Sequence, residues 1–276
     1  AVIMRFSDDG ELRKTRFVSA VIRSCRRFAY EEAYEYLTLP GKEPIAPESP
    51  EDKKLAKHLN RAWQLAALLR KRRFEAGSLD LDFPEVRAVL DDNGVAIDVK
   101  RIEHDESHQL IEEFMLAANE AGARETRNET APSIYRIHED PDPEKLCDFA
   151  DQASGYGYRP GDVTVKAELQ KLFREIRGKP EEHSLKIALL KSLKRAAYSA
   201  DPLGHYGLSK LNYTHFTSPI RRYADLVVHR VLRKIEAKRG NGPPADPTPS
   251  QGQLVSVAKH ISETERVAAD AERDSQ

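Results

Sequence analysis

The chain has 276 residues, 39% of them hydrophobic, which suits one large domain or two ordinary ones with a buried core and argues against a disordered chain. The 44 Lys and Arg residues nearly balance the 45 Asp and Glu residues, so the overall charge indicates neither a polyanionic partner nor a membrane surface. The sequence has no apolar run of membrane-spanning length and no signal-type N-terminus. Cys25 and Cys147 have neither disulfide nor zinc-knuckle spacing. We therefore expect a cytoplasmic protein without a membrane partner.

The first predicted elements are a hairpin and two helices. Residues 2–6 alternate as a strand does, residues 7–10 have strong turn chemistry, and residues 12–22 supply the second strand. Apolar residues then follow helical spacing over residues 26–37 and 52–73.

The middle of the chain is predicted to be mostly helical, after a second hairpin. Asn93-Gly94 favours a tight turn between strands at residues 87–90 and 95–99. A long helix follows at residues 107–124. Further helices are predicted at residues 143–153, 166–177 and 184–200.

The clearest predicted helix covers residues 218–238, with Ser218 as its cap and Pro219 at its first position. Its apolar face consists of Ile220, Ala224, Val227, Val231 and Ile235. A loop at residues 240–252 and a charged helix at residues 263–276 follow. Both ends of the chain fall inside an element, so we expect a piece of a longer polypeptide.

Arg221 and Arg222 fall in the first turn of this predicted helix, where the helix dipole disfavours a cation by about 0.3 to 1 kcal/mol. A bound phosphate would offset that cost, because free N–H groups, the Ser218 hydroxyl and a guanidinium can share its oxygens. Alternatively, Arg222 pairs with Asp225 and Arg221 is a solvated surface charge. At this point both interpretations stay open.

Local charge indicates a basic face on this neutral chain. Between His205 and Arg239, eight Lys and Arg residues stand against two acidic residues, a net charge of +6. A second basic stretch, residues 13–27, is interleaved with aromatic residues up to Tyr30. Cations beside aromatic rings suit single-stranded nucleic acid, although aromatic residues taken alone more often belong to a core.

The remaining polar residues give little chemistry by spacing alone. Glu112 and Asn119 are seven residues apart and share a helix face, which predicts a polar notch for a ligand hydroxyl, although a helical Glu is more often solvated or ion-paired. Glu272 is equally ambiguous. The sequence has no ligand-spaced His, no nuclease-type Asp cluster and no nucleophile elbow, so no metal ligand is assigned.

Residues 215–230 (HFTSPIRRYADLVVHR) resemble the signature of the ribonuclease II and ribonuclease R family, and are closer to its ribonuclease R branch. Other stretches fall in the family's order along nearly the whole chain. They are residues 19–24 (SAVIRS) with Tyr30, 110–119 (LIEEFMLAAN), 135–138 (YRIH), 205–208 (HYGL) and 271–274 (AERD). The resemblance implies the later two-thirds of an RNB-type catalytic domain, a single incomplete α+β domain over residues 1–276, with a mixed β-sheet flanked by helices that form an RNA channel.

The resemblance also implies an activity. Family members are processive 3′-to-5′ exoribonucleases in which magnesium, held by aspartates, activates water and nucleoside 5′-monophosphates leave one at a time. Arg221 matches the arginine that holds the scissile phosphate. Positions implied to contact RNA are Tyr30, Glu112, Thr217, Ser218, Arg222 and Glu272, with Tyr30 helping to set the final product.

Two departures from the family matter. The aspartate cluster lies before the segment that begins at Ala1, so this chain alone is expected not to cleave RNA. The base-clamping aromatic aligns with Leu81, which lacks a π-face. The flanking RNA-binding barrels are also missing. We expect a monomer that binds single-stranded RNA, either alone or with a separate chain that carries the rest of the domain. The alternative function is a catalytically dead RNA-binding or regulatory module.

Overall fold

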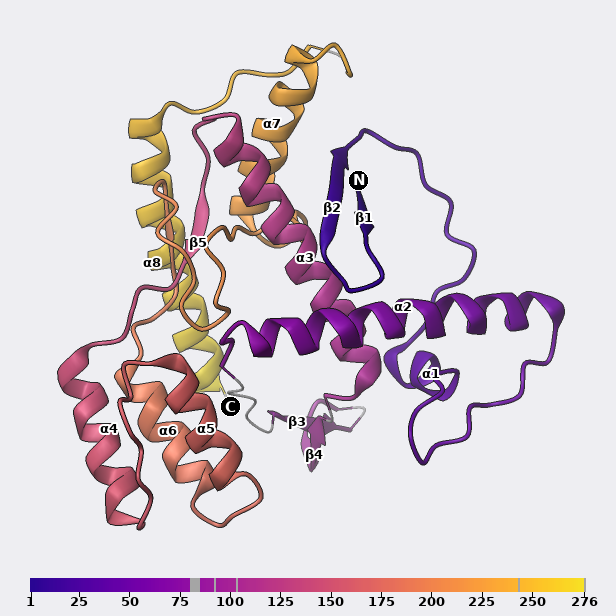
Figure 1. Ribbon diagram of the computed structural model, residues 1–276. Helices are drawn as coiled ribbons and strands as arrows, with labels where there is room; N and C mark the ends of the chain where they lie inside the picture. The colour runs from indigo at the N-terminus through magenta and orange to yellow at the C-terminus, as the bar shows by residue number, and fades with distance from the viewer. Residues whose placement is uncertain (80–84, 92, 103, 243, 276) are drawn as a thin grey trace. The chain divides into compact units, whose positions relative to one another are not determined.

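The computed structural model describes residues 1–79, 85–91, 93–102, 104–242 and 244–275. Over this part, the chain forms eight helices and six strands (Figure 1). It divides into two compact units: unit 1 comprises Ala1–Val21, Arg73–Leu79 and Met115–Gln276, and unit 2 comprises Ile22–Arg72 and Asp80–Phe114. The predicted α+β class is confirmed.

Unit 1 contains two of the small sheets. β1 (Val2–Phe6) and β2 (Leu12–Phe17) form the expected antiparallel hairpin. β5 (Tyr135–Ile137) pairs antiparallel with β6 (Ala197–Ser199), and His138 adds a parallel bridge to His205. In place of the single mixed sheet that we expected, the described strands pair two by two. Two of the three pairs are local hairpins that close on their own turns, whereas β5 pairs with the distant β6.

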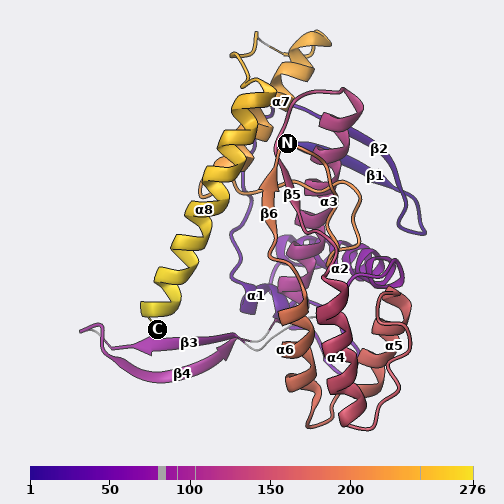
Figure 2. The same ribbon diagram turned by 90° about the vertical axis from the view of Figure 1, so that its left-hand side faces the viewer.

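Five helices lie wholly in unit 1, and α3 (Glu106–Asn128) contributes its later part. They are α4 (Pro143–Gly155), α5 (Lys166–Ile176), α6 (Glu182–Ser192), α7 (Tyr223–Lys238) and α8 (Gln251–Ser275). The α4 and α5 helices touch through the stacked rings of Phe149 and Phe173, whose centroids lie 6.3 Å apart. In Figure 2, α8 runs beside β6, where the Tyr198 N–H donates to the Ser262 hydroxyl at 2.9 Å.

The predicted helix at residues 184–200 is wrong in its second half. α6 ends at Ser192, and Leu193 already has an extended backbone, with φ −79° and ψ 145°. Residues Ala197–Ser199 then form β6 opposite β5. This strand depends on a partner far away in the sequence, which local periodicity does not contain.

The predicted start of the helix at Ser218 is also wrong. α7 begins at Tyr223, and its N-cap residue Arg222 is extended, with φ −125° and ψ 122°. Ile220, expected on the apolar face, is 102% exposed. Arg221 therefore lies in a turn before α7 and not in its first turn.

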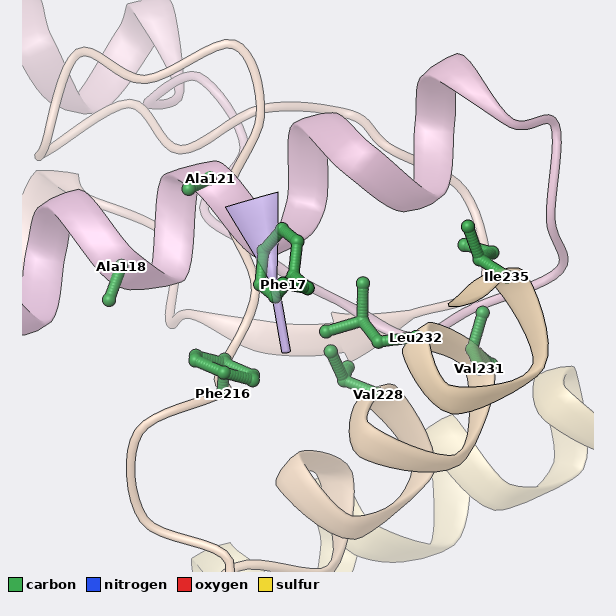
Figure 3. Close-up of a cluster of buried hydrophobic side chains, with 8 residues drawn as sticks. All are labelled: Phe17, Ala118, Ala121, Phe216, Val228, Val231, Leu232 and Ile235. Atoms are coloured by element: carbon green, nitrogen blue, oxygen red, sulfur yellow. The ribbon is translucent and has the colours of Figure 1, made fainter. Parts of the chain in front are cut away.

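Two hydrophobic clusters meet on α7. In Figure 3, Val228, Val231, Leu232 and Ile235 of α7 pack with Phe17, Ala118, Ala121 and Phe216. Phe17 and Phe216 meet edge to face, with ring centroids 5.6 Å apart. Ala224 and Val227 belong to the second cluster, which includes Leu254 and Ala258 of α8. The buried residues of α7 therefore contribute to both clusters.

Unit 2 contains α1 (Tyr30–Glu35), α2 (Pro50–Glu75) up to Arg72, the hairpin of β3 (Glu85–Leu90) and β4 (Ala96–Ile102), and the start of α3. Ser49 caps α2, because its hydroxyl accepts the Asp52 N–H at 3.0 Å. The α1 helix is shorter than the predicted helix at residues 26–37. None of the helices in the described part of the chain combines the length and apolar content that a bilayer-spanning helix needs.

Candidate functional site

A tight turn carries Arg221 just before α7. The N–H groups of Arg221 and Arg222 both donate to the Ser218 carbonyl, at 3.3 and 3.2 Å. The Ser218 N–H donates in turn to Asp225 Oδ1 at 2.7 Å. The turn is therefore tied at its first residue to a side chain inside the helix that follows it.

The carboxylate of Asp225 is fully buried and holds Arg222 in a two-point contact. Arg222 Nε donates to Oδ2 at 2.8 Å and Nη2 donates to Oδ1 at 2.9 Å. Nη2 also approaches the Thr217 hydroxyl at 3.4 Å. Of the two interpretations left open by the sequence, the ion pair is the one that the structure contains for Arg222.

Arg221 differs from its neighbour. Its side chain is exposed and makes no hydrogen bond or ion pair with the residues that the structure describes. A guanidinium in this state is available to an anion in solution, and its backbone is fixed by the turn. The turn thus presents one available cation beside the hydroxyl groups of Thr217 and Ser218.

A polar network includes His215, two residues before Thr217, and reaches Glu265 of α8. The Tyr198 hydroxyl and His215 Nδ1 lie 2.8 Å apart, and the Arg136 guanidinium lies 4.7 Å from the Tyr198 ring centroid and pairs with Glu265. Burial, and then the charges of Arg222 and Arg136, lower the pKa of His215 to about 3. Burial raises the pKa of Tyr198 to about 12. His215 is therefore neutral near pH 7 and cannot act there as a general acid.

Asn119 does not form the predicted ligand notch. Its side chain is 2% exposed, and Oδ1 accepts the Phe216 N–H at 2.9 Å while Nδ2 donates to the Tyr213 hydroxyl at 3.2 Å. Both ends of the amide are therefore used to hold the segment that leads into Thr217 and Ser218.

Tyr30 occupies a different kind of surface, in unit 2. Its ring is 43% exposed and stacks on His108, with centroids 3.9 Å apart and planes inclined by 18°. His108 Nδ1 lies 2.9 Å from Asp105 Oδ1. Burial opposes ionisation of Asp105, but hydrogen bonds from Ser107 and His108 outweigh it and lower its pKa.

A pocket of about 440 Å³ opens beside Tyr30. Its apolar walls include Phe28, Leu37, Leu59, Leu110 and Ile111. A half-exposed aromatic ring next to an apolar hollow suits the flat face of a nucleobase.

Glu112 and Glu272 are the other predicted contact residues that the structure describes. Glu112 is 34% exposed and lies 3.7 Å from Arg70 in unit 2. Glu272 is exposed near the end of α8. Leu81, the residue at the base-clamping position, lies outside the described residues.

Two family-like stretches, at Tyr135–His138 and His205–Leu208, meet for structural reasons. His138 Nδ1 accepts the Gly207 N–H at 3.2 Å, and His205 Nδ1 accepts the Leu208 N–H at 3.3 Å. A Cβ on Gly207 would lie 3.1 Å from His138 Nδ1, so glycine permits this close approach. Burial, and then His138, lower the pKa of His205 to about 3. Both rings accept backbone N–H groups and hold the turn.

Within the described residues, no three or more His, Cys, Asp or Glu side chains gather as a metal site. These residues therefore do not fit the magnesium cluster that the resemblance implies. Reasoning from the sequence also missed the Asp225 contact to Ser218 and the network of Tyr198, Arg136 and Glu265. The partners in that network lie 17 and 129 residues apart along the chain, so no local pattern indicates them.

Known proteins are similar to this chain in sequence and in fold. The family model described as the RNB domain matches residues 1–238. Proteins named ribonuclease R from Aquifex aeolicus and Thermotoga maritima are each 36% identical to it, over 99% of this chain. The chain spans 38% of the length of each of these relatives. A solved structure of Mycoplasma genitalium RNase R in complex with ribose-methylated single-stranded RNA matches with a TM-score of 0.85 at 26% identity, over 98% of this chain and 42% of that chain.

Proposed function

Because the chain belongs to the RNB domain family, we propose that it is part of the catalytic domain of a 3′-to-5′ exoribonuclease of the ribonuclease R type. The substrate is single-stranded RNA, which the intact enzyme degrades processively to nucleoside 5′-monophosphates. Support for the substrate comes from the related protein that was solved with single-stranded RNA.

The observation that carries the proposal is the state of Arg221. Its guanidinium is exposed and has no partner among the described residues, while the turn beneath it is held by the buried Asp225. The turn fixes the backbone from which this cation projects, so the guanidinium is available near the turn to the charge that develops on a phosphate. We therefore propose that Arg221 holds the scissile phosphate and stabilises the transition state.

The remaining contacts follow the same proposal. Thr217 and Ser218 lie near the phosphate, Tyr30 contacts a terminal base, and Glu112 and Glu272 contact sugar or base. The contact of Arg222 with RNA stays a prediction, and its guanidinium is already bound to Asp225.

Magnesium dependence is proposed for the intact enzyme only. We propose that its ligands are the aspartates that the family resemblance implies ahead of the matched segment. We assign no step to the metal from the residues described here. The intact enzyme is proposed to be cytoplasmic and monomeric, unless a separate chain supplies the aspartates.

Arg221→Ala in the intact enzyme tests the role of Arg221. We expect kcat to fall by about 100- to 1,000-fold, the effect typical of losing a donor to a developing oxyanion, and RNA affinity to fall much less. Single-turnover cleavage and fluorescence anisotropy measure the two quantities. Equal losses in both would remove Arg221 from the catalytic role.

The alternative function, an RNA-binding or regulatory module without catalysis, makes a different prediction. Supplying the aspartate-bearing segment in trans should restore magnesium-dependent release of monophosphates if the chain is enzymatic. Tight RNA binding without turnover after this complementation would favour the module.

A further inference from the structure

Tyr30 receives little support from the helix that carries it. It is the first residue of α1, a six-residue helix in which no residue is buried, and the N-cap residue Ala29 makes no side-chain capping hydrogen bond. The Tyr30 hydroxyl makes no hydrogen bond with any residue that the structure describes. The orientation of the Tyr30 ring must therefore come from a contact elsewhere in unit 2.

The imidazole of His108 makes that contact. The centroids of the two rings lie 3.9 Å apart and the ring planes are inclined by 18°, so the imidazole covers one face of the Tyr30 ring. Tyr30 is still 43% exposed. Because a nearly parallel stack covers one face only, a nucleobase can stack on the other face.

His108 is held in turn by the residue that caps its helix. Asp105 directly precedes α3, and its Oδ1 accepts the backbone N–H groups of Ser107 and His108 at 2.9 and 3.2 Å. The same oxygen lies 2.9 Å from His108 Nδ1. Since an ionised carboxylate only accepts hydrogen bonds, Nδ1 carries the proton. One capping residue therefore fixes both the start of α3 and the plane of the imidazole.

A metal site at these residues is the main alternative, because His104, Asp105 and His108 are close in the sequence. In the part of the chain that the structure describes, no three or more side chains of this kind gather around a metal position. The His104 ring lies 5.4 Å from the His108 ring and is tilted by 32°, and His108 Nδ1 already binds Asp105. A metal site would also leave the stack on Tyr30 unexplained.

We propose that His108 is a positioning residue for Tyr30: its imidazole holds the Tyr30 ring in the orientation that stacks on a terminal base, without contacting RNA itself. This inference rests on the proposed function, because Tyr30 contacts RNA only within that proposal. A ring that is already ordered loses less conformational entropy when a base binds. The stack on His108 should therefore increase the affinity for the terminal nucleotide.

The test is a double-mutant cycle between Tyr30 and His108. Anisotropy measures the affinity of the full 276-residue chain for a short fluorescent oligoadenylate. Tyr30→Ala should lower the affinity about 5- to 160-fold, the range for one lost base stack. His108→Ala should lower it about 2- to 13-fold, the range for one lost aromatic pair. The double variant should bind no more weakly than Tyr30→Ala, because His108 acts only through the Tyr30 ring.

Two further substitutions separate the stack from the hydrogen bond. His108→Phe keeps a ring but cannot donate to Asp105, and it should retain most of the affinity. His108→Asn keeps a donor without the ring, and it should bind as weakly as His108→Ala. The matched control is His58→Ala, an exposed histidine of α2 in unit 2, which should bind like the unchanged chain. Thermal unfolding followed by circular dichroism verifies that each variant is folded.

The products of the intact enzyme give a readout that a loss of stability alone does not change. His108→Ala should alter the length of the shortest product in the same direction as Tyr30→Ala. His108→Phe should leave that length unchanged. A denaturing gel measures it in all three variants.

The outcomes separate this inference from the proposed function. If Tyr30→Ala weakens binding and His108→Ala does not, the positioning role is overturned and the proposed function stands. Additive losses in the double variant would mean that His108 contacts RNA directly, which also overturns it. Retained affinity in His108→Asn with a loss in His108→Phe would assign the effect to the cap of α3 and refute the stack. Failure of the unchanged chain to bind oligoadenylate would overturn the proposed function as well.

Discussion

The turn before α7 and the surface around Tyr30 differ in which part of the proposed contact residue is held in place: the backbone of Arg221 in the turn, and the ring of Tyr30 on its surface. The turn is tied by a fully buried carboxylate and by a buried amide, so the backbone under Arg221 has few alternatives. Tyr30 is held by a ring stack and stays 43% exposed. The difference matches the chemistry proposed for each: a charge that meets a reacting phosphate must be placed accurately, whereas a base-stacking ring has to accept every base.

The strongest way to break this comparison is to remove the carboxylate under the turn. Asp225→Ala should lower the free energy of unfolding by about 3 to 5 kcal/mol, because it leaves Arg222 as an uncompensated, largely buried charge. Urea denaturation followed by circular dichroism measures the loss. Exposed Asp148→Ala on α4 is the control and should change stability by less than about 0.5 kcal/mol.

A double substitution identifies the cause of the stability loss in Asp225→Ala. Arg222→Met together with Asp225→Leu should recover much of the stability, since no charge is then buried alone. If the double variant is no more stable than Asp225→Ala, the unpaired charge is not the cause.

Acid should weaken the unit that carries the turn. Folding keeps His205 and His215 neutral, with pKa values of about 3, while in the unfolded chain they take up protons below about pH 6.5. Stability is therefore lost as the pH falls, by about 2 kcal/mol for each ring between about pH 7 and pH 5. Urea midpoints at a series of pH values measure this.

Substituting one buried and one exposed histidine sharpens the pH test. His205→Gln should remove roughly half of this pH dependence, and exposed His58→Gln should leave it as it is in the unchanged chain. Identical pH profiles for the two variants would contradict the assignment to the buried rings.

The amide that holds the segment before the turn should contribute less than Asp225. Asn119→Ala leaves the buried Phe216 N–H without its acceptor, which should cost about 1 to 3 kcal/mol. Tyr213→Phe removes only the other hydrogen bond and should cost about 1 kcal/mol or less. The same denaturation experiment compares them, and a larger loss for Tyr213→Phe would reverse the expected order.

Tyr30 should show a small effect on stability and a distinct effect on products. Tyr30→Ala removes one exposed ring stack, so stability should fall by about 1 kcal/mol. In the intact enzyme, the same change should alter the length of the shortest product, and Tyr30→Phe should leave it unchanged. A denaturing gel gives the product length; an unaltered limit product in Tyr30→Ala would remove Tyr30 from the site.

Local signals in the sequence predicted most helices but not the contacts that close the site. α5 starts at Lys166 as predicted, and the Asn93-Gly94 hairpin forms. In contrast, Ser218 has good capping chemistry but gives its N–H to Asp225, and Arg222 interrupts the helix. Ser218 thus pairs with a residue seven positions further on, outside the capping pattern, whereas β6 depends on a partner far away in the sequence, which local patterns do not contain.

The sequence predicts a set of site residues, but it does not contain the contacts that hold their backbone in place. The sequence contains the Arg222 and Asp225 pair at helical spacing, so that ion pair could be proposed in advance. The fixing of the Phe216 backbone by Asn119 spans 97 residues, and the contact of Tyr198 with His215 depends on a strand that was predicted to be helix. Such contacts require the fold first.

Because α7 is the common wall of two hydrophobic clusters, neither cluster can open without exposing a side of this helix. Its central amides should therefore become accessible to solvent only when unit 1 unfolds as a whole. Hydrogen–deuterium exchange should find the slowest amides of unit 1 around Val227, Val228 and Val231. The helix that follows the Arg221 turn would then also be the last part of unit 1 to exchange.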